Sequence, residues 1–260
     1  MKNHISLFIF AIALLSGPVS ANDLSMTAVK DTLASIPGEH NYIYVRTPLG
    51  EDEEKNYDEI TFYDGLGREL DFAQSYGADR AGAIMAHHHL IEYDSLGRKE
   101  KQWLSTNTSF SYMSPEDLKG GVLWDYHDAG KRSYLQTNYE SSPLNRITEQ
   151  YGVGDAWGDH PARMEYLTNI PADSLRCSFY FIDDNDSLIR RGDYRSGELQ
   201  VTKATDEDGK PTYTFVDKQG RTLLTRLGRG NQQADTYFVF DRFGRIRYVL
   251  PPMINDEISA

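Results

Sequence analysis

The chain has 260 residues, which is long enough for one sizeable β domain or two small ones. With 27 basic and 39 acidic side chains, its formal net charge is −12, which argues against nucleic acid or an anionic membrane surface as a target. Most of its aromatic content is 17 Tyr and 11 Phe, which favours a tyrosine-lined β fold over a helical one.

The first 21 residues are typical of a secretory signal peptide. Lys2 supplies the positive charge, Ile5–Leu15 is an apolar core, and Val19–Ala21 offers small residues for cleavage. The core is too short for a membrane span. We therefore expect export to the periplasm, the cell surface or the medium after cleavage near Ala21. The next segment, residues 22–38, is expected to form a short helix or a leader.

A hexapeptide then recurs along the chain: an aromatic or β-branched residue, Asp, two variable positions, Gly and a basic residue. Asp suits the first position of a type I turn, because its carboxylate accepts hydrogen bonds from backbone amides ahead of it. Gly accepts φ > 0 at the exit of such a loop. Strand-like flanks rich in Tyr, Phe, Val, Ile and Thr surround the copies, so each predicts a β-hairpin. The expected structural turn residues are Tyr63, Asp64, Gly67, Arg68, Tyr93, Asp94, Gly97, Arg98, Asp206, Gly209, Asp217, Gly220, Arg221, Asp241, Gly244 and Arg245.

A sixth and weaker copy is Tyr126–Lys131, in which His127 stands where Asp should be. Ser114–Asp117 has the cap, the proline and the early acids of a short helix, and Gly120–Gly121 is expected to end that helix. We predict a mainly all-β fold, in which antiparallel hairpin repeats form a curved or twisted sheet with one or two short helices. The β domain is expected to span 39–254, with a tail at 255–260.

No residue set predicts a catalytic, cofactor-binding or metal site. His87 and His89 would share a face of a strand, but no carboxylate or cysteine lies at a ligand-like spacing, so His87–His89 is interpreted as part of a strand. Asp183–Asp186 and Asp206–Gly209 lack the pattern of a calcium loop and are interpreted as turns. The single cysteine, Cys177, is expected to be a small buried residue.

The Tyr-Asp-x-x-Gly-Arg turns resemble the YD repeats of bacterial RHS proteins. Over about residues 39 to 254, the chain is similar to the N-terminal domain of unknown function that opens large secreted RHS proteins of Bacteroides-type bacteria. The similarity is carried by Asn41–Tyr44, Asp58–Arg68, Ser142–Arg146, Glu149–Gly152, Glu165–Asn169, Thr205–Lys210 and Tyr248–Pro252.

The resemblance implies hairpins that build a long β-sheet. In such proteins the sheet spirals into a shell, which either encloses a toxin or serves as a surface scaffold. This chain departs from that pattern where it stops, at Ala260, so we expect it to be truncated before the long repeat shell, and any toxin activity of relatives does not carry over. We expect a non-enzymatic exported scaffold or interaction module without a cofactor, forming part of an RHS-type surface or secreted protein.

The expected partner is an RHS-type protein or another chain that pairs with the sheet edge at Arg245–Leu250. Nucleic acid and stable membrane insertion are not expected. One alternative is a glycan-binding module, in which tyrosines and Trp103, Trp124 and Trp157 stack on sugars. Another is a hydrolase that uses a carboxylate pair which the sequence does not locate.

Overall fold

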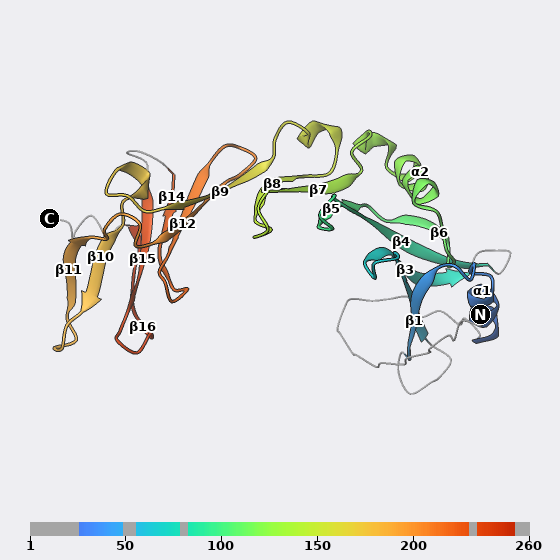
Figure 1. The fold of residues 1–260 in the computed structure, drawn as a ribbon, viewed down its shortest axis with the longest axis horizontal. Helices are drawn as coiled ribbons and strands as arrows, with labels where there is room; N and C mark the ends of the chain where they lie inside the picture. The colour runs from blue at the N-terminus through green and yellow to red at the C-terminus, as the bar shows by residue number, and fades with distance from the viewer. Residues whose placement is uncertain (1–25, 49–55, 79–82, 229–232, 253–260) are drawn as a thin grey trace. The chain divides into compact units, whose positions relative to one another are not determined.

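The computed structural model describes residues 26–48, 56–78, 83–228 and 233–252 (Figure 1). The predicted signal peptide, the acidic run Glu51–Glu54 and the tail at 255–260 lie outside these residues. The described chain contains 16 strands, all paired antiparallel, and two α-helices, which confirms the predicted fold class. It divides into two compact units. Unit 1 comprises Met1–Thr137 with Gly152–Gly158, and unit 2 comprises Asn138–Tyr151 with Asp159–Ala260.

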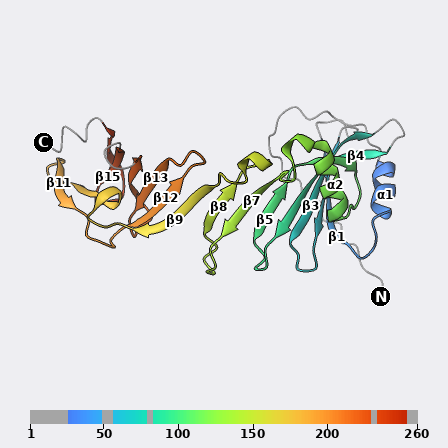
Figure 2. The same cartoon turned by 90° about the horizontal axis from the view of Figure 1, so that it is seen from above.

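Unit 1 is built on consecutive antiparallel strands. They follow one another in space in chain order, except that β4 pairs with two later strands. β5 pairs with the end of β4 at Ile91–Tyr93, whereas β6 pairs with its start at Met85–His88. Figure 2 shows these strands side by side. The strands are β1 (Asn41–Pro48), β2 (Asn56–Tyr63), β3 (Glu69–Ala78), β4 (Ile84–Tyr93), β5 (Lys99–Trp103), β6 (Thr106–Ser109) and β7 (Tyr134–Tyr139).

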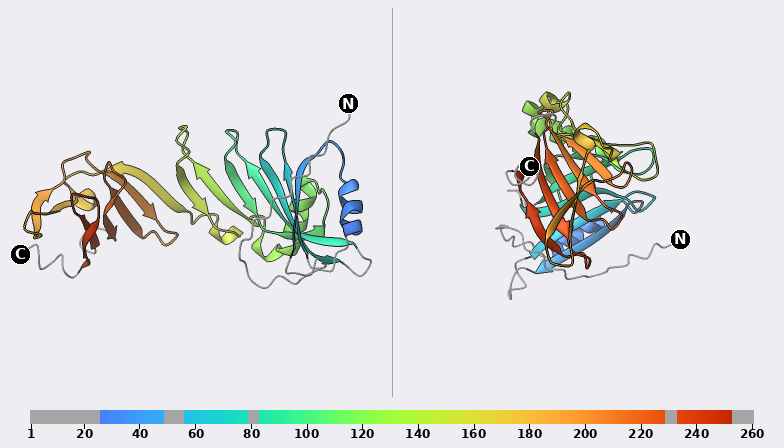
Figure 3. Two further views of the ribbon diagram at one scale, coloured as in Figure 1. Left: turned by 90° about the horizontal axis from the view of Figure 1, so that it is seen from below. Right: turned by 90° about the vertical axis from the view of Figure 1, so that its left-hand side faces the viewer.

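The core of unit 1 follows from the period of two along its strands. In β2 buried and half-buried positions alternate strictly, so that Ile60 and Phe62 point to the same face. Helix α1 (Met26–Ala34) covers part of that core with the fully buried Val29 and lies beside the strands (Figure 3). The buried cluster comprises Val29, Ile36, Tyr44, Ile60, Phe62, Ala73, Ile84, Ala86 and Phe110.

Helix α2 (Pro115–Asp125) begins at the predicted residue but extends further than predicted. The Ser114 hydroxyl accepts a hydrogen bond from the Asp117 amide at 3.1 Å, and Pro115 occupies the first turn. The prediction that Gly120–Gly121 ends the helix is wrong. A Cβ atom on Gly121 would lie 2.6 Å from the Thr106 hydroxyl oxygen, so the glycine lets the helix approach β6 closely.

Unit 2 contains a second run of antiparallel strands and a separate hairpin. β9 pairs with β12, and the two-stranded sheet of β10 and β11 is inserted between them in sequence. The strands are β8 (Ile147–Tyr151), β9 (Ala162–Thr168), β10 (Ser178–Ile182), β11 (Leu188–Asp193), β12 (Gln200–Thr205), β13 (Pro211–Val216), β14 (Thr222–Leu227), β15 (Ala234–Phe240) and β16 (Ile246–Leu250). Single 3₁₀ turns occur at His127–Ala129 and Asp155–Trp157 in unit 1 and at Asp173–Leu175 in unit 2.

The core of unit 2 joins the inserted hairpin to the sheet. The Tyr180 ring of β10 packs edge-on against Tyr237 of β15, with ring centroids 4.9 Å apart. Cys177 is 1% exposed in the same cluster, and burial raises the pKa of its thiol to about 12. This confirms the prediction of a small buried residue, since the thiol stays protonated and unreactive at neutral pH.

Within the described residues, no helix is long and apolar enough to cross a membrane.

Candidate functional site

The recurring hexapeptide forms one turn geometry at five places. In the turn between β2 and β3, the Asp64 amide donates to the Arg68 carbonyl at 2.8 Å, and the Gly67 amide donates to the Asp64 carbonyl at 3.0 Å. The same pair of hydrogen bonds recurs in the turns that begin at Asp94, Asp206, Asp217 and Asp241. The glycines of the five turns, Gly67, Gly97, Gly209, Gly220 and Gly244, have φ between +77° and +79°.

The aspartate carboxylate is used within its own turn. Asp64 Oδ1 accepts from the amides of Leu66 at 2.8 Å and Arg68 at 2.9 Å, while its Oδ2 accepts from Arg68 Nε at 2.7 Å. The hydrogen bond from the Arg68 amide is the main cause that lowers the pKa of Asp64. Asp94, Asp217 and Asp241 make the equivalent bonds to their own arginines, Arg98, Arg221 and Arg245. These turns therefore hold their charges in internal bonds rather than offering them to a ligand.

The arginine of one turn also reaches the aromatic residue that opens the next hairpin turn. The Arg68 guanidinium lies 4.6 Å from the centroid of the Tyr93 ring, and that of Arg221 lies 5.1 Å from the Phe240 ring. A Cβ atom on Gly97 would come within 3.1 Å of Arg68 Nη1. The first, fifth and sixth positions of the hexapeptide thus meet between successive hairpins.

Reasoning from the sequence missed this contact between hairpins. The available signal was the recurrence of an aromatic residue in the turn after each arginine, at Tyr93 after Arg68 and at Phe240 after Arg221. This recurrence predicts the contact between the arginine and the aromatic ring only when the register of the strands between the two turns is known.

The turn between β10 and β11 shares this geometry without its glycine, whereas the longer turn from Glu140 to Arg146 shares only the bond from its first amide to its last carbonyl. Between β10 and β11, the Asp183 carboxylate accepts from the amides of Asn185 and Ser187, and Asp186 takes the glycine position with φ of 64°. In the turn from Glu140 to Arg146, Asn145 has φ of 54°. The Arg146 guanidinium donates twice to the Glu140 carboxylate, at 2.7 and 2.6 Å. Asn and Asp tolerate the left-handed conformation better than other side chains, which explains both substitutions.

The sixth predicted copy, Tyr126–Lys131, is wrong as a hairpin. Its residues follow α2 directly and form a 3₁₀ turn. The Asp155 carboxylate, from the glycine-rich loop 152–158, accepts hydrogen bonds from the amides of Lys131 and Arg132 at 3.2 and 3.0 Å. An aspartate distant in sequence therefore accepts the amide of the sixth motif position, Lys131, which the motif's own Asp accepts elsewhere.

The three histidines of β4 lie on alternate faces. His88 is 1% exposed; its Nδ1 lies 2.6 Å from Asp71 Oδ2, and its Nε2 lies 2.9 Å from the Ser109 carbonyl oxygen. On the other face, the His87 ring stacks on Tyr76 with centroids 4.4 Å apart. Burial is the main cause that lowers the pKa of His89. Among the described residues, no three metal-binding side chains gather, and His88 of β4 is a buried polar link between Asp71 of β3 and Ser109 of β6.

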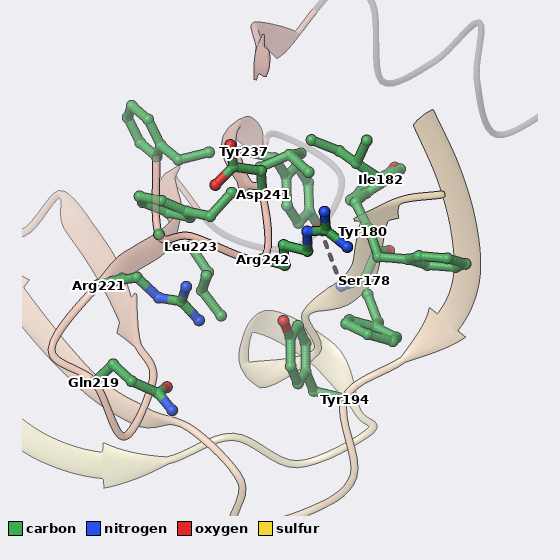
Figure 4. Close-up of a pocket in the computed structure, with 16 residues that line it drawn as sticks. Ser178, Tyr180, Ile182, Tyr194, Gln219, Arg221, Leu223, Tyr237, Asp241 and Arg242 are labelled. Carbon is green, nitrogen blue, oxygen red and sulfur yellow. Dashed lines mark hydrogen bonds between the residues drawn. The ribbon is translucent and has the colours of Figure 1, made fainter. Parts of the chain in front are cut away.

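A cleft of about 650 Å³ lies in unit 2 (Figure 4). It lies between the β10 strand and the turns that follow β13 and β15. Aromatic rings and planar polar groups line it, including Phe179, Phe181, Tyr194, Gln219, Arg221 and Arg242.

The tryptophans considered for sugar stacking all lie in unit 1, in different settings. Trp103 of β5 donates from its indole nitrogen to Glu92 at 2.9 Å and packs against Tyr134. Trp124 of α2 is 83% exposed, and Trp157 of the 152–158 loop is 47% exposed. None of the three lines the cleft.

Comparison with known proteins gives a match for part of the chain. Residues 41–168, from β1 to β9, match a family described as a domain of unknown function (DUF6443). No curated protein matches the chain.

Two solved structures are similar at low identity. The "Crystal Structure of TcdB2-TccC3-Cdc42" has 14% identity and a TM-score of 0.49, covering 84% of this chain and 10% of that chain. The "Crystal Structure of TcdB2-TccC3" has 13% identity and a TM-score of 0.49, covering 95% of this chain and 12% of that chain. The chain thus spans about a tenth of the length of these proteins. What the comparisons assign to this chain is a match to the domain of unknown function over residues 41–168.

Proposed function

We propose that the chain is a non-enzymatic, exported β module that forms part of an RHS-type surface or secreted assembly. The observation that carries this proposal is how the recurring turns use their charges. Their aspartates bond their own backbone and arginines, and two of the arginines lie over the aromatic ring of the next hairpin. Such turns join hairpins to one another. The match of residues 41–168 to a domain of unknown function agrees with the resemblance of the turns to YD repeats.

The open edge of β16 is the proposed contact with a partner. β16 pairs with β15 through Tyr237↔Leu250 and Phe238↔Val249, and no other strand of the described residues pairs with its second edge. On β16, Ile246 is 55% exposed and Val249 is 51% exposed. An unpaired strand edge with exposed apolar side chains nearby favours the addition of a strand from another chain. The proposed partner is an RHS-type protein of the same bacterium.

Amide hydrogen exchange tests the proposal on the chain 22–260, with and without that RHS-type protein in purified form. We expect slower exchange in β16 when the partner is present. Val249→Lys should abolish the protection, because a charged edge residue opposes strand addition. Ile189→Lys, on the 37% exposed Ile189 of β11, is the matched control and should leave it intact. Unchanged exchange in β16, or equal loss in both variants, would contradict edge pairing.

We also propose glycan binding as a second function, because an aromatic-lined cleft with polar groups is present in unit 2. Aromatic rings offer apolar faces to sugar rings, while amide, hydroxyl and guanidinium groups bond the sugar hydroxyls. A glycan array probed with the chain 22–260 is the test. Specific hits that weaken in a Phe181→Leu variant support this function, and an array without signal above background removes it.

A further inference from the structure

Two arginines line the cleft in unit 2, Arg221 and Arg242, and they differ in whether a carboxylate pairs with them. Asp217 is paired with Arg221, whose Nη2 lies 2.6 Å from Asp217 Oδ2. Asp241 is similarly bound to Arg245, and its Oδ1 accepts from the amides of Phe243 and Arg245 at 2.9 and 3.0 Å. Asp241 lines the cleft and is held by the arginine of its own turn. Asp193, whose Oδ1 accepts from the Ser178 hydroxyl at 3.3 Å beside the cleft, is paired with Arg190.

Arg242 remains as the cation of the cleft. It occupies a variable position of the turn after β15, and its guanidinium lies 4.9 Å from the Phe243 ring. Within the described residues, no carboxylate forms an ion pair with it. Figure 4 shows its side chain directed across the cleft toward the segment that carries Ser178 and Tyr180. The cleft thus presents one exposed positive charge on a chain whose formal net charge is −12.

The opposite wall of the cleft supplies aromatic surface. The Phe179 and Phe181 rings have centroids 5.9 Å apart and planes 23° apart, and Tyr194 meets Phe179 edge-on at 4.9 Å. All three are half-buried and line the cleft. Burial is the main cause that raises the pKa of Tyr194, so its hydroxyl stays protonated and able to donate a hydrogen bond.

The ligand that suits this arrangement has a flat apolar face, hydroxyl groups and one negative charge at its edge. We propose that the cleft binds an acidic sugar residue, with its carboxylate on Arg242 and its ring against the aromatic wall of Phe179, Phe181 and Tyr194. The side chains of Gln219 and Ser178 lie in the same cleft and can bond the sugar hydroxyls. This inference rests on the proposed glycan-binding function and adds the class of sugar.

Isothermal titration calorimetry with trigalacturonate, maltotriose and triglutamate tests the inference on the chain 22–260. We expect trigalacturonate to bind more tightly than the neutral sugar or the acidic peptide. Arg242→Gln should weaken trigalacturonate about tenfold, since one charge-assisted hydrogen bond contributes about 1.5 kcal/mol or more. Arg191→Gln removes the same charge from an exposed site on β11 outside the cleft, and should leave binding unchanged.

Three results would overturn the inference: maltotriose binding as tightly as trigalacturonate, triglutamate binding as tightly, or equal effects of the two arginine variants. In the first case glycan binding itself survives, and only the preference for an acidic sugar fails. If no sugar binds and the glycan array is also blank, the glycan-binding function fails together with the inference.

Discussion

Gly67 and Gly97 occupy the same position in successive turns, with φ of +77° and +79°, but their surroundings differ. No atom lies within 4 Å of a Cβ built on Gly67, whereas a Cβ on Gly97 would lie 3.1 Å from Arg68 Nη1. Both turns therefore need glycine for its positive φ. The second turn also needs it because a side chain at Gly97 would collide with Arg68. The two contributions can be separated by the same substitution at both positions.

We predict that Gly67→Ala and Gly97→Ala each destabilise unit 1 by about 1–2 kcal/mol, because alanine is strained in the left-handed conformation. Gly97→Ala should cost more, since Arg68 must also move away from the Tyr93 ring. In an Arg68→Ala background the two glycine substitutions should become equal. Urea unfolding measures the four glycine variants and the Arg68→Ala parent, and an equal cost of the two glycine substitutions in the unmodified background would contradict the predicted contact.

The turn from Glu140 to Arg146 predicts a specific response to acid. Two hydrogen bonds from the Arg146 guanidinium are the main cause that lowers the pKa of Glu140 from 4.5 to about 2. A carboxylate with a lowered pKa contributes stability above its unfolded pKa and loses it as the pH falls toward the folded pKa. The contribution should thus be complete above about pH 4.5 and disappear between there and pH 2.

Carbon-detected NMR titration of the Glu140 carboxyl group measures this directly. We expect a midpoint near pH 2 in the unmodified chain, and a midpoint shifted toward 4.5 in Arg146→Met, which removes the guanidinium. A midpoint near 4.5 in both would show that the bidentate pair does not form in solution.

At the scale of elements, the hairpins were predictable from the sequence because their turns depend on local backbone chemistry. An Asp that accepts amides and a Gly with positive φ need no distant partner, so the pattern at Asp64–Gly67 is visible in the sequence alone. The turn at Asp183 is predictable as a turn but not as a copy, because Asp186 replaces the glycine. The failed copy at Tyr126 depends on Asp155, more than 20 residues away, which no local pattern reveals.

The length of α2 was not predictable for a similar reason. Two consecutive glycines usually favour the end of a helix, but Gly121 is needed where α2 lies against Thr106 of β6. The aromatic cleft was likewise unpredictable, because it brings together β10 and turns that are about 40 and 60 residues further along the chain. Contacts between elements, and not the elements themselves, were the part that the sequence left open.

Substitutions in α2 test this interpretation. Gly120 is exposed, and a Cβ atom at this position would have no other atom within 4 Å, so Gly120→Ala should stabilise unit 1 by about 0.5–1 kcal/mol. Gly121→Ala should instead destabilise it, because the Thr106 hydroxyl must move and lose its 2.7 Å hydrogen bond to Asp125. Thermal unfolding of the two variants distinguishes them, and a gain in stability for both would show that the helix does not approach β6 as described.

At the scale of the whole molecule, the same contact between an arginine of one turn and an aromatic ring of the next occurs in both units. Arg68 lies over Tyr93 in unit 1, and Arg221 lies over Phe240 in unit 2. In repeat-like folds, stability arises largely from contacts between neighbouring repeats, and an arginine that spans two hairpins supplies such a contact. The central claim is therefore that the shared aromatic, Gly and Arg positions of the recurring hexapeptide join successive hairpins of a scaffold, whereas ligand contacts are proposed for a variable position, Arg242.

Double-mutant cycles at the two pairs test that claim most directly. Arg68→Met with Tyr93→Leu probes unit 1, and Arg221→Met with Phe240→Leu probes unit 2. In each cycle the free energy of unfolding of the corresponding unit is measured for the single and double variants. We predict a coupling free energy of about 0.5–1 kcal/mol in both cycles, as expected for a partly exposed cation over an aromatic ring. Additive effects in both units, with coupling below about 0.3 kcal/mol, would contradict a role of the hexapeptide in joining hairpins.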